Sequence, residues 1–310
     1  MSPKASSGFS SCTRSPCVEV RRVRPALGTL VAIAAGGREA GAVAQAIDAA
    51  FAAVELTERL MSFHSADSEL SRLNRSANRR PQKVHAWTFA VLRRAARIAS
   101  LSEGLFDPTV APVLLHAGLL PGSGLPTAQR DATWRDLGLQ RDFHVFYARP
   151  MLLDLGGIAK GFAVDQAIHA LRRRGCSHGC VNAGGDLRRF GPGFEPVRVR
   201  TRDGTAPLAE LRCGAIGTSA ARAVHAGRLA QPIGVIVDPR NRELWHAAGG
   251  GVSVAAPSCT VADALTKVAA LAGPACRPLL ERFGAQAYWW TDAAGGAPQT
   301  ANAMVPRNRW

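Results

Sequence analysis

Apolar positions recur at helical spacing in four stretches of this chain. In the clearest, the alanine-rich stretch 40–61, Ile47 and Val54 lie on one predicted helix face. A loop with a short helical start at 67–70 is predicted over 63–74. The same spacing predicts four helices in all, over 40–61, 88–101, 157–174 and 260–271.

Alternating and β-branched stretches predict strands between these helices. The first runs over 20–33, with an interruption near Pro25. Turns are predicted at the glycine-rich segment 182–186 and at Asp203-Gly204, which would close a hairpin. Further strands are predicted over 179–181, 197–202, 215–224, 233–237, 251–254 and 287–291. Because helices and strands mix without regular βαβ alternation, the predicted fold class is α+β.

The composition is that of a folded, basic protein. Of 310 residues, 47% are hydrophobic, and the net charge is +15. Such a charge raises the hypothesis of nucleic-acid binding. The arginines, however, are scattered, aromatic residues make up only 6%, and no nucleic-acid-binding motif interleaves with the basic residues. A solvated basic surface, or a field that attracts a small polyanionic substrate, fits better, so we expect no nucleic-acid partner.

The N-terminal segment is rich in Ser, Cys and Arg and lacks the apolar core of a signal peptide. We therefore expect a disordered tail over 1–20, one domain over 21–310 and a cytoplasmic protein. A misassigned start would make a periplasmic location compatible with the sequence as well. No apolar run approaches the roughly 20 residues of a membrane helix, so no membrane span is expected. The 7 irregularly spaced cysteines suit a reducing compartment.

Two segments combine the residue types that bind phosphate groups. Residues 154–165 read DLGGIAKGFAVD and 262–267 read ADALTK, each at the start of a predicted helix. Glycines let a backbone approach an anion closely, and a helix N-terminus offers free N–H groups. A carboxylate placed there could hold a divalent cation against the anion. The pattern predicts a nucleotide-diphosphate site, although a tight turn after Asp154 would also account for the glycines.

Asp263 has a purely structural interpretation as well. Thr260 and Asp263 have the spacing of a capping box, in which the threonine caps the helix and the acidic residue follows at N3. Asp263 and Lys267 are four residues apart, in the order that favours a surface ion pair. The chain otherwise uses arginine, so a geometric need for lysine is indicated in the two segments. The four lysines are Lys4, Lys83, Lys160 and Lys267, and the last two lie inside these segments.

Seven short segments occur in a fixed order along the chain. They are MSFHSADSELSRLN (61–74), GLFDPT (104–109), DLGGIAKGFAVD (154–165), NAGGDL (182–187), GTS (217–219), VDPR (237–240) and ADALTK (262–267). In this order they resemble the ApbE family, the FAD:protein FMN transferases. The resemblance extends from about Arg24 to about Thr291. It implies an ApbE-like mixed α/β fold with a largely antiparallel sheet.

The resemblance implies a flavin transferase that binds FAD with Mg²⁺ and breaks the diphosphate. FMN would pass to a threonine of an acceptor flavoprotein that carries a flavinylation motif, and AMP would leave. The alternative is an FAD-binding relative that hydrolyses FAD to FMN and AMP, or that only binds flavin. No segment of the kind Asp-Gly-x-Thr/Ser-Gly/Ala-Thr was found in this chain, so transfer would occur in trans.

Matching positions imply three sets of site residues. Asp263 and Lys160 would be catalytic, and the metal would be held by the Gly157 carbonyl, Asp263 and Thr266. The remaining set would bind the cofactor: Leu27, His64, Leu105, Phe106, Asp107, Asp154, Lys160 and Ile236.

The chain departs from the family pattern at three positions in or beside these segments. His64 stands where the family often has tyrosine, and Val235 stands where a histidine commonly precedes Ile-x-Asp-Pro. Lys267 stands where a threonine usually ligates the metal, with Thr266 one residue earlier. Because an ammonium cannot ligate a cation, this departure predicts weaker metal dependence here than in relatives that carry threonine at the position.

Overall fold

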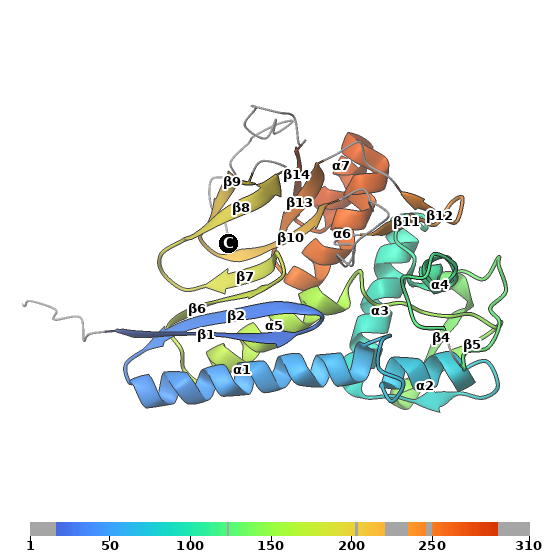
Figure 1. Ribbon diagram of the computed structural model, residues 1–310, viewed down its shortest axis with the longest axis horizontal. Coiled ribbons are helices and arrows are strands. Elements are labelled where there is room, and N and C mark those ends of the chain that lie inside the picture. Colours follow the sequence, from blue (N-terminus) through green and yellow to red (C-terminus); the bar gives the residue numbers. More distant parts are fainter. Residues whose placement is uncertain (1–16, 123, 202–203, 221–234, 246–249, 291–310) are drawn as a thin grey trace, which may run out of the picture.

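A computed structural model describes residues 17–122, 124–201, 204–220, 235–245 and 250–290 (Figure 1). Its centre is a seven-stranded sheet with the order β1-β2-β6-β7-β10-β13-β14. The strands are β1 (Val18–Ala26), β2 (Thr29–Gly37), β6 (His178–Ala183), β7 (Asp186–Phe190), β10 (Gly214–Ala220), β13 (Gly251–Ala256) and β14 (Gln286–Trp290). Every neighbouring pair is antiparallel, which confirms the predicted α+β class with a largely antiparallel sheet.

Three long helices pack against this sheet and against one another in the order α1, α5, α6 (Figure 1). They are α1 (Ala40–Met61), α5 (Ala159–Arg173) and α6 (Cys259–Ala272), and all were predicted to within two residues at each end. Their apolar stripes face the sheet, so that Ile33 of β2, Phe51 of α1 and Ile168 of α5 share one core. Burial of side chains of this size supplies the main driving force for the arrangement.

Shorter elements form a second region beside the sheet, coloured from light blue to green in Figure 1. The helix α3 belongs to it, and the strands pair in the order β3-β5-β4. Its elements are α2 (Glu69–Ser76), β3 (Gln82–Lys83), α3 (Ala86–Leu101), η1 (Pro108–Val110), α4 (Ala111–His116), η2 (Trp134–Asp136), β4 (Leu137–Gln140), η3 (Arg141–Phe143) and β5 (His144–Tyr147).

Two hairpins and a closing helical segment complete the described chain. The hairpin β8–β9 has the paired strands expected there, although Asp203 of the predicted turn lies outside the described residues. The bounds are β8 (Glu195–Thr201), β9 (Gly204–Leu211), β11 (Ile236–Asp238), β12 (Glu243–Trp245), η4 (Gly273–Cys276) and α7 (Arg277–Arg282). The parts of predicted strands at 221–224, 233–234 and 291 also lie outside the described residues.

The predicted first strand is in fact a hairpin of β1 and β2. Leu27 and Gly28 turn the chain with φ angles of 56° and 69°. A leucine in the left-handed region is uncommon, so the sequence carried no turn signal there. Pro25 lies within β1, which pairs only with β2 among the described strands, and an edge strand tolerates a residue without an N–H. β1 begins at Val18, inside the stretch 1–20 predicted to be a tail.

The second half of the loop predicted over 63–74 belongs to the helix α2, of which only a short start at 67–70 was predicted. Ser68 caps it by accepting a hydrogen bond from the Ser71 amide at 3.0 Å. Leu70 and Leu73 are buried. The polar composition of this segment concealed a helix that tertiary packing of two leucines stabilises.

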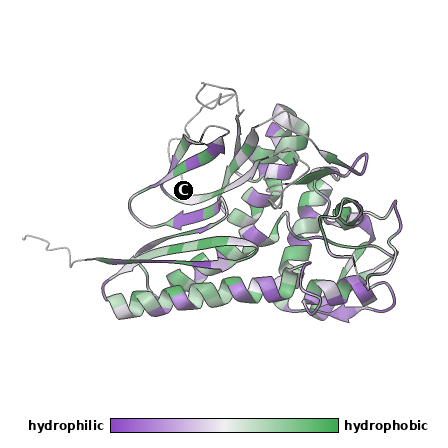
Figure 2. Cartoon of the chain, viewed as in Figure 1, coloured by the Kyte–Doolittle hydropathy of each residue, from purple (hydrophilic) through white to green (hydrophobic). Residues whose placement is uncertain are grey.

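Within the described residues, one helix is long and apolar enough to cross a membrane by length and composition alone. This is α1, with 22 residues and a mean hydropathy of 1.2, although no such run was expected from the sequence. Figure 2 shows hydrophilic residues recurring along it. Its apolar face packs against α5 and the β1–β2 hairpin, with Val43, Phe51 and Val54 buried. The pattern is that of a helix at the core of the fold.

The helices α5 and α6 approach each other closely at Gly161. A Cβ atom at this position would lie 2.2 Å from the Cys259 carbonyl oxygen and 2.9 Å from the Asp263 Cβ. Both neighbours belong to α6, and one of them is backbone, so neither can move aside cheaply. Only glycine lets the two helices reach this distance.

We therefore expect Gly161→Ala to lower the free energy of unfolding by at least about 2 kcal/mol, since it overpacks a helix contact. The measurement is urea denaturation. Gly41→Ala is the matched control, because Gly41 is exposed in α1 and a Cβ there would meet only a Glu39 carboxylate oxygen at 3.6 Å. It should leave stability unchanged or raise it by up to about 1 kcal/mol. Equal stability of both variants would show that α5 and α6 can separate freely.

Candidate functional site

The helix α6 is capped by Ser258 and not by Thr260. The Ser258 hydroxyl accepts a hydrogen bond from the Val261 amide. Thr260 instead donates its hydroxyl to Asp165 at 2.5 Å. The capping box predicted for Thr260 and Asp263 is therefore wrong, and Asp263 lies two residues further into the helix than that box would place it.

Asp165, at the end of the DLGGIAKGFAVD segment, ties α5 to the start of α6. Its carboxylate accepts the amides of Cys259 and Thr260 at 2.9 and 3.0 Å. It also pairs with Arg188 of β7 at 2.6 Å. A carboxylate at a helix N-terminus satisfies free N–H groups and meets the positive end of the helix dipole. The sequence indicated no such role for Asp165, because its partners lie more than twenty residues away.

Asp263 is fully buried, and both of its carboxylate oxygens have donors. Oδ2 accepts the Gly161 amide at 3.0 Å, and Oδ1 pairs with the ammonium of Lys267. The same ammonium donates to the Asp263 main-chain carbonyl at 3.0 Å. The predicted contact between Asp263 and Lys267 is present, but the aspartate side chain is 0% exposed and the pair is not a surface ion pair.

A second ion pair lies beside the first. Lys160 of α5 contacts the Asp186 carboxylate of β7 at 3.1 Å, and the other oxygen of Asp186 accepts the Thr218 amide at 3.3 Å. The Asp186 side chain is 3% exposed, whereas that of Lys160 is 33% exposed. We call Asp186, Asp263, Lys160 and Lys267 the charge cluster.

The four charges influence one another. Burial alone would raise the pKa of Asp263, but Lys160 and Lys267 outweigh burial and hold this pKa below its ordinary range. Burial and the neighbouring Asp263 raise the pKa of Asp186. Burial would lower the pKa of Lys160, but Asp186 and Asp263 raise it instead. The Lys160 ammonium thus keeps its proton and its positive charge at neutral pH.

The Thr266 hydroxyl has its hydrogen-bond partners inside the protein. The residue is fully buried, and its hydroxyl bonds to the Asp263 main-chain carbonyl at 2.6 Å and to the Ser219 hydroxyl at 2.7 Å. The adjacent Gly217 allows β10 to approach α6, because a Cβ there would lie 2.7 Å from the Asp263 amide. The GTS segment thus supports the inner side of α6.

These contacts do not fit the predicted ligation of a divalent cation by Gly157, Asp263 and Thr266. Mg²⁺ requires several oxygen ligands in octahedral geometry. Here one Asp263 oxygen holds an ammonium, the other holds an amide, and the Thr266 hydroxyl is used inside the protein. Within the described residues, no group of three or more His, Cys, Asp or Glu side chains could hold a metal ion.

The loop at Gly156 and Gly157, which we call the glycine loop, packs on the aliphatic stem of Lys267. A Cβ on Gly157 would lie 3.3 Å from Lys267 Cε and 3.5 Å from the Phe106 ring. Burial raises the pKa of the nearby Asp154, while Lys160, Lys267 and a Gly156 amide oppose the rise. The structure thus brings Phe106, Asp154 and Gly157 of the predicted site to the charge cluster.

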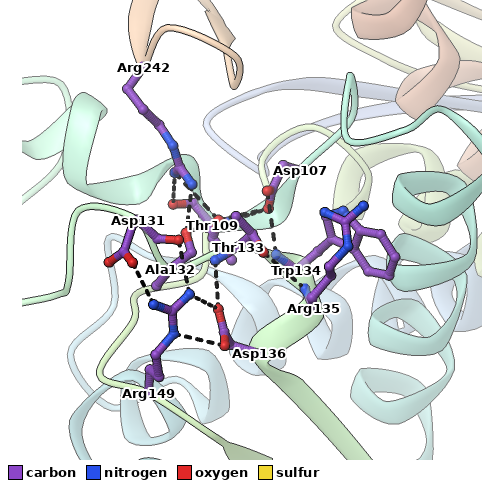
Figure 3. A network of polar contacts seen from close by, with 10 residues as sticks. All are labelled: Asp107, Thr109, Asp131, Ala132, Thr133, Trp134, Arg135, Asp136, Arg149 and Arg242. Atoms are coloured by element: carbon purple, nitrogen blue, oxygen red, sulfur yellow. Dashed lines mark hydrogen bonds and ion pairs between the residues drawn. The ribbon is translucent and has the colours of Figure 1, made fainter.

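Asp107 serves the local structure of its segment. Its carboxylate accepts the amide and hydroxyl of Thr109 at 2.8 and 2.7 Å, and the Trp134 amide at 3.4 Å (Figure 3). Arg242, which follows β11, donates to the carbonyls of Thr109 and Ala132 and so joins the β11–β12 hairpin to this segment. Nearby, Arg149 binds Asp131 and Asp136 (Figure 3).

The remaining predicted cofactor residues occupy different surroundings. His64 is exposed and close enough to Asp154 for its charge to act on that carboxyl. Leu27 lies at the tip of the β1–β2 hairpin, where its amide donates to Glu58 at 3.1 Å. Leu105 is partly buried, and Ile236 is buried in β11. Their contacts with a flavin stay predictions.

Comparisons with known proteins identify the family and the fold of the chain. The model of the ApbE family matches residues 27–289. A Treponema pallidum protein named FAD:protein FMN transferase is 28% identical over 316 residues, covering 91% of this chain and 87% of that protein. The ApbE protein of Thermotoga maritima has a similar structure, with a TM-score of 0.74, 25% identity and coverage of 91% and 97%. The flavin transferase ApbE of Vibrio cholerae, at 23% identity and a TM-score of 0.72, shares the fold over 89% of this chain and 94% of its own.

Asp154→Asn should stabilise the protein without ligand, increasingly so as pH rises. The pKa of Asp154 is raised above its ordinary 3.8, so below that value the wild type and the variant have equally neutral side chains. As pH rises through the folded-state pKa, the wild type alone must ionise a disfavoured carboxyl and loses stability. Urea denaturation at pH values from below 3.8 to above the folded-state pKa measures the difference in the free energy of unfolding between the two proteins.

Asp48→Asn is the control, because its effect on stability should change with pH in the opposite direction. Hydrogen bonds from Arg22 and Arg24 lower the pKa of Asp48, so its variant should lose stability relative to the wild type as pH rises. Parallel pH profiles for the two variants would contradict the assigned environment of Asp154.

Proposed function

Since the chain belongs to the ApbE family, we propose that it is an FAD:protein FMN transferase. The observation that carries the proposal is the difference in solvent exposure between the negative and the positive side chains of the charge cluster. The carboxylates of Asp263 and Asp186 are 0% and 3% exposed, whereas the side chains of Lys267 and Lys160 are 18% and 33% exposed. The accessible part of the cluster is therefore cationic, as binding of the FAD diphosphate requires.

The reaction would be a phosphoryl transfer to a protein hydroxyl. The oxygen of an acceptor threonine forms a bond to the phosphorus of the FMN half, and the bond from this phosphorus to the bridging oxygen breaks. AMP leaves with the electron pair, and the hydroxyl proton passes to solvent. Such reactions depend chiefly on positioning and on stabilising charge. Lys160 and Lys267 would supply the charge, and the loop at Gly156 and Gly157 would allow the diphosphate to approach.

The surrounding residues would position the flavin half. Phe106 offers a buried aromatic ring next to Gly157, and exposed His64 lies near Asp154. A role of Mg²⁺ was predicted from the resemblance, but the donors around Asp263 do not favour it. We therefore assign no step to a metal.

The acceptor would be a separate protein with a threonine in a flavinylation motif. The test is to incubate the full chain with FAD and such an acceptor, and to measure the intact mass of the acceptor. We expect a gain equal to FMN minus one water, with an equal amount of AMP. An acceptor with that threonine replaced by alanine is the control and should keep its mass. Release of FMN and AMP with an unmodified acceptor would favour the hydrolase alternative instead.

The free protein should also prefer FAD to FMN. FMN has one phosphate group and lacks the diphosphate that two ammonium groups can grip, so its affinity should be at least about tenfold lower, as expected for one lost charge-assisted hydrogen bond. Isothermal titration calorimetry with both flavins measures this ratio. Equal affinities would mean that the charge cluster does not contact the diphosphate.

A further inference from the structure

Lys267 occupies the position in which a bound cation would be expected. Its ammonium rests on a carboxylate oxygen and on the main-chain carbonyl of the same residue, Asp263. Carboxylate and carbonyl oxygens are the ligands that hard cations use in proteins. The ammonium thus takes the oxygen ligands that Asp263 could offer to a metal.

The surroundings hold the lysine in this place. Its aliphatic stem packs against the loop, since Lys267 Cε and Cδ are the atoms nearest to a Cβ built on Gly157, at 3.3 and 3.8 Å. On the other side, the carboxylate of Asp263 is fixed by the Gly161 amide. The ammonium therefore lies beside the glycine loop, where the proposed diphosphate would approach.

The charges also balance without a metal. Asp186 and Asp263 carry two negative charges, and Lys160 and Lys267 carry two positive charges, all within one partly buried cluster. A divalent cation would have to displace the Lys267 ammonium from a buried carboxylate, and a charge without a partner in such surroundings is unfavourable. An anionic ligand, by contrast, meets two ammonium groups that are already in place.

We propose that the Lys267 ammonium replaces the divalent cation, so that this chain binds and cleaves FAD without one. The substrate assignment in this inference rests on the proposed function. The chemistry is unchanged: the threonine oxygen bonds to the FMN phosphorus, the bond to the bridging oxygen breaks, and AMP leaves. Lys267 would be a catalytic residue, because its charge contacts the diphosphate directly.

The experiment compares wild type, Lys267→Thr and Lys83→Thr as full-length proteins. FAD affinity and AMP release in the presence of an acceptor are measured in excess EDTA and in Mg²⁺. Binding of Mn²⁺ is measured separately, without flavin, by electron paramagnetic resonance. Lys83 is exposed in β3, outside the charge cluster, and serves as a matched control for the loss of a lysine.

We expect the wild type and Lys83→Thr to show equal FAD affinity and AMP release in EDTA and in Mg²⁺, and to leave Mn²⁺ free. Lys267→Thr should bind FAD about tenfold more weakly in EDTA, the loss expected for one charge-assisted hydrogen bond, and recover in Mg²⁺. It should also bind Mn²⁺, because the Asp263 carboxylate loses its ammonium partner.

Wild-type protein that binds Mn²⁺, or that requires Mg²⁺ to cleave FAD, would overturn the inference. These wild-type measurements need no variant. They therefore decide the question even if circular dichroism shows that Lys267→Thr does not fold. If the wild type binds no FAD in either buffer, the proposed function fails. The Mn²⁺ measurement then still tests whether Lys267 excludes a metal from Asp263.

Discussion

The close contact between α5 and α6 is the constraint on which the site depends. At Gly161 the two helices meet with backbone against backbone, and the Gly161 amide bonds to the Asp263 carboxylate. Asp165, one turn further along α5, binds the first amides of α6. Two helix starts are thereby held side by side, and each contributes one lysine to the same place. A larger separation would leave Asp263 without its amide partner.

Burial of charge gives this junction its electrostatic character. Aspartates inside a protein are unfavourable unless they are paired, and here each has an ammonium and at least one amide. The carboxylates thus hold the lysines in place, and the lysines face the more accessible side. Arginine would fit less well, because its planar guanidinium is larger than an ammonium and forms forked contacts. This explains why a chain rich in arginine has lysine at these two positions.

The sequence predicted those features that are encoded locally. The long amphipathic helices follow from their periodicity, and the contact of Asp263 with Lys267 follows from a spacing of four residues. The burial of that contact, and the partners Gly161, Asp165 and Asp186, depend on segments that lie far apart in the chain. The turn at Leu27 was missed because leucine seldom adopts a positive φ, and β3, β4 and β5 were missed because strands of two to four residues carry little pattern.

The edge strand β1 has a consequence for the behaviour of the protein in concentrated solution. Among the described strands, the nine-residue β1 pairs only with β2, and an edge strand of this length is a template for pairing with other chains and hence for aggregation. β1 carries Arg21, Arg22, Arg24 and Pro25, and two of these arginines bind Asp48 of α1. Cations and a proline at a sheet edge discourage a second strand from docking. Part of the large positive charge therefore protects this sheet from self-association.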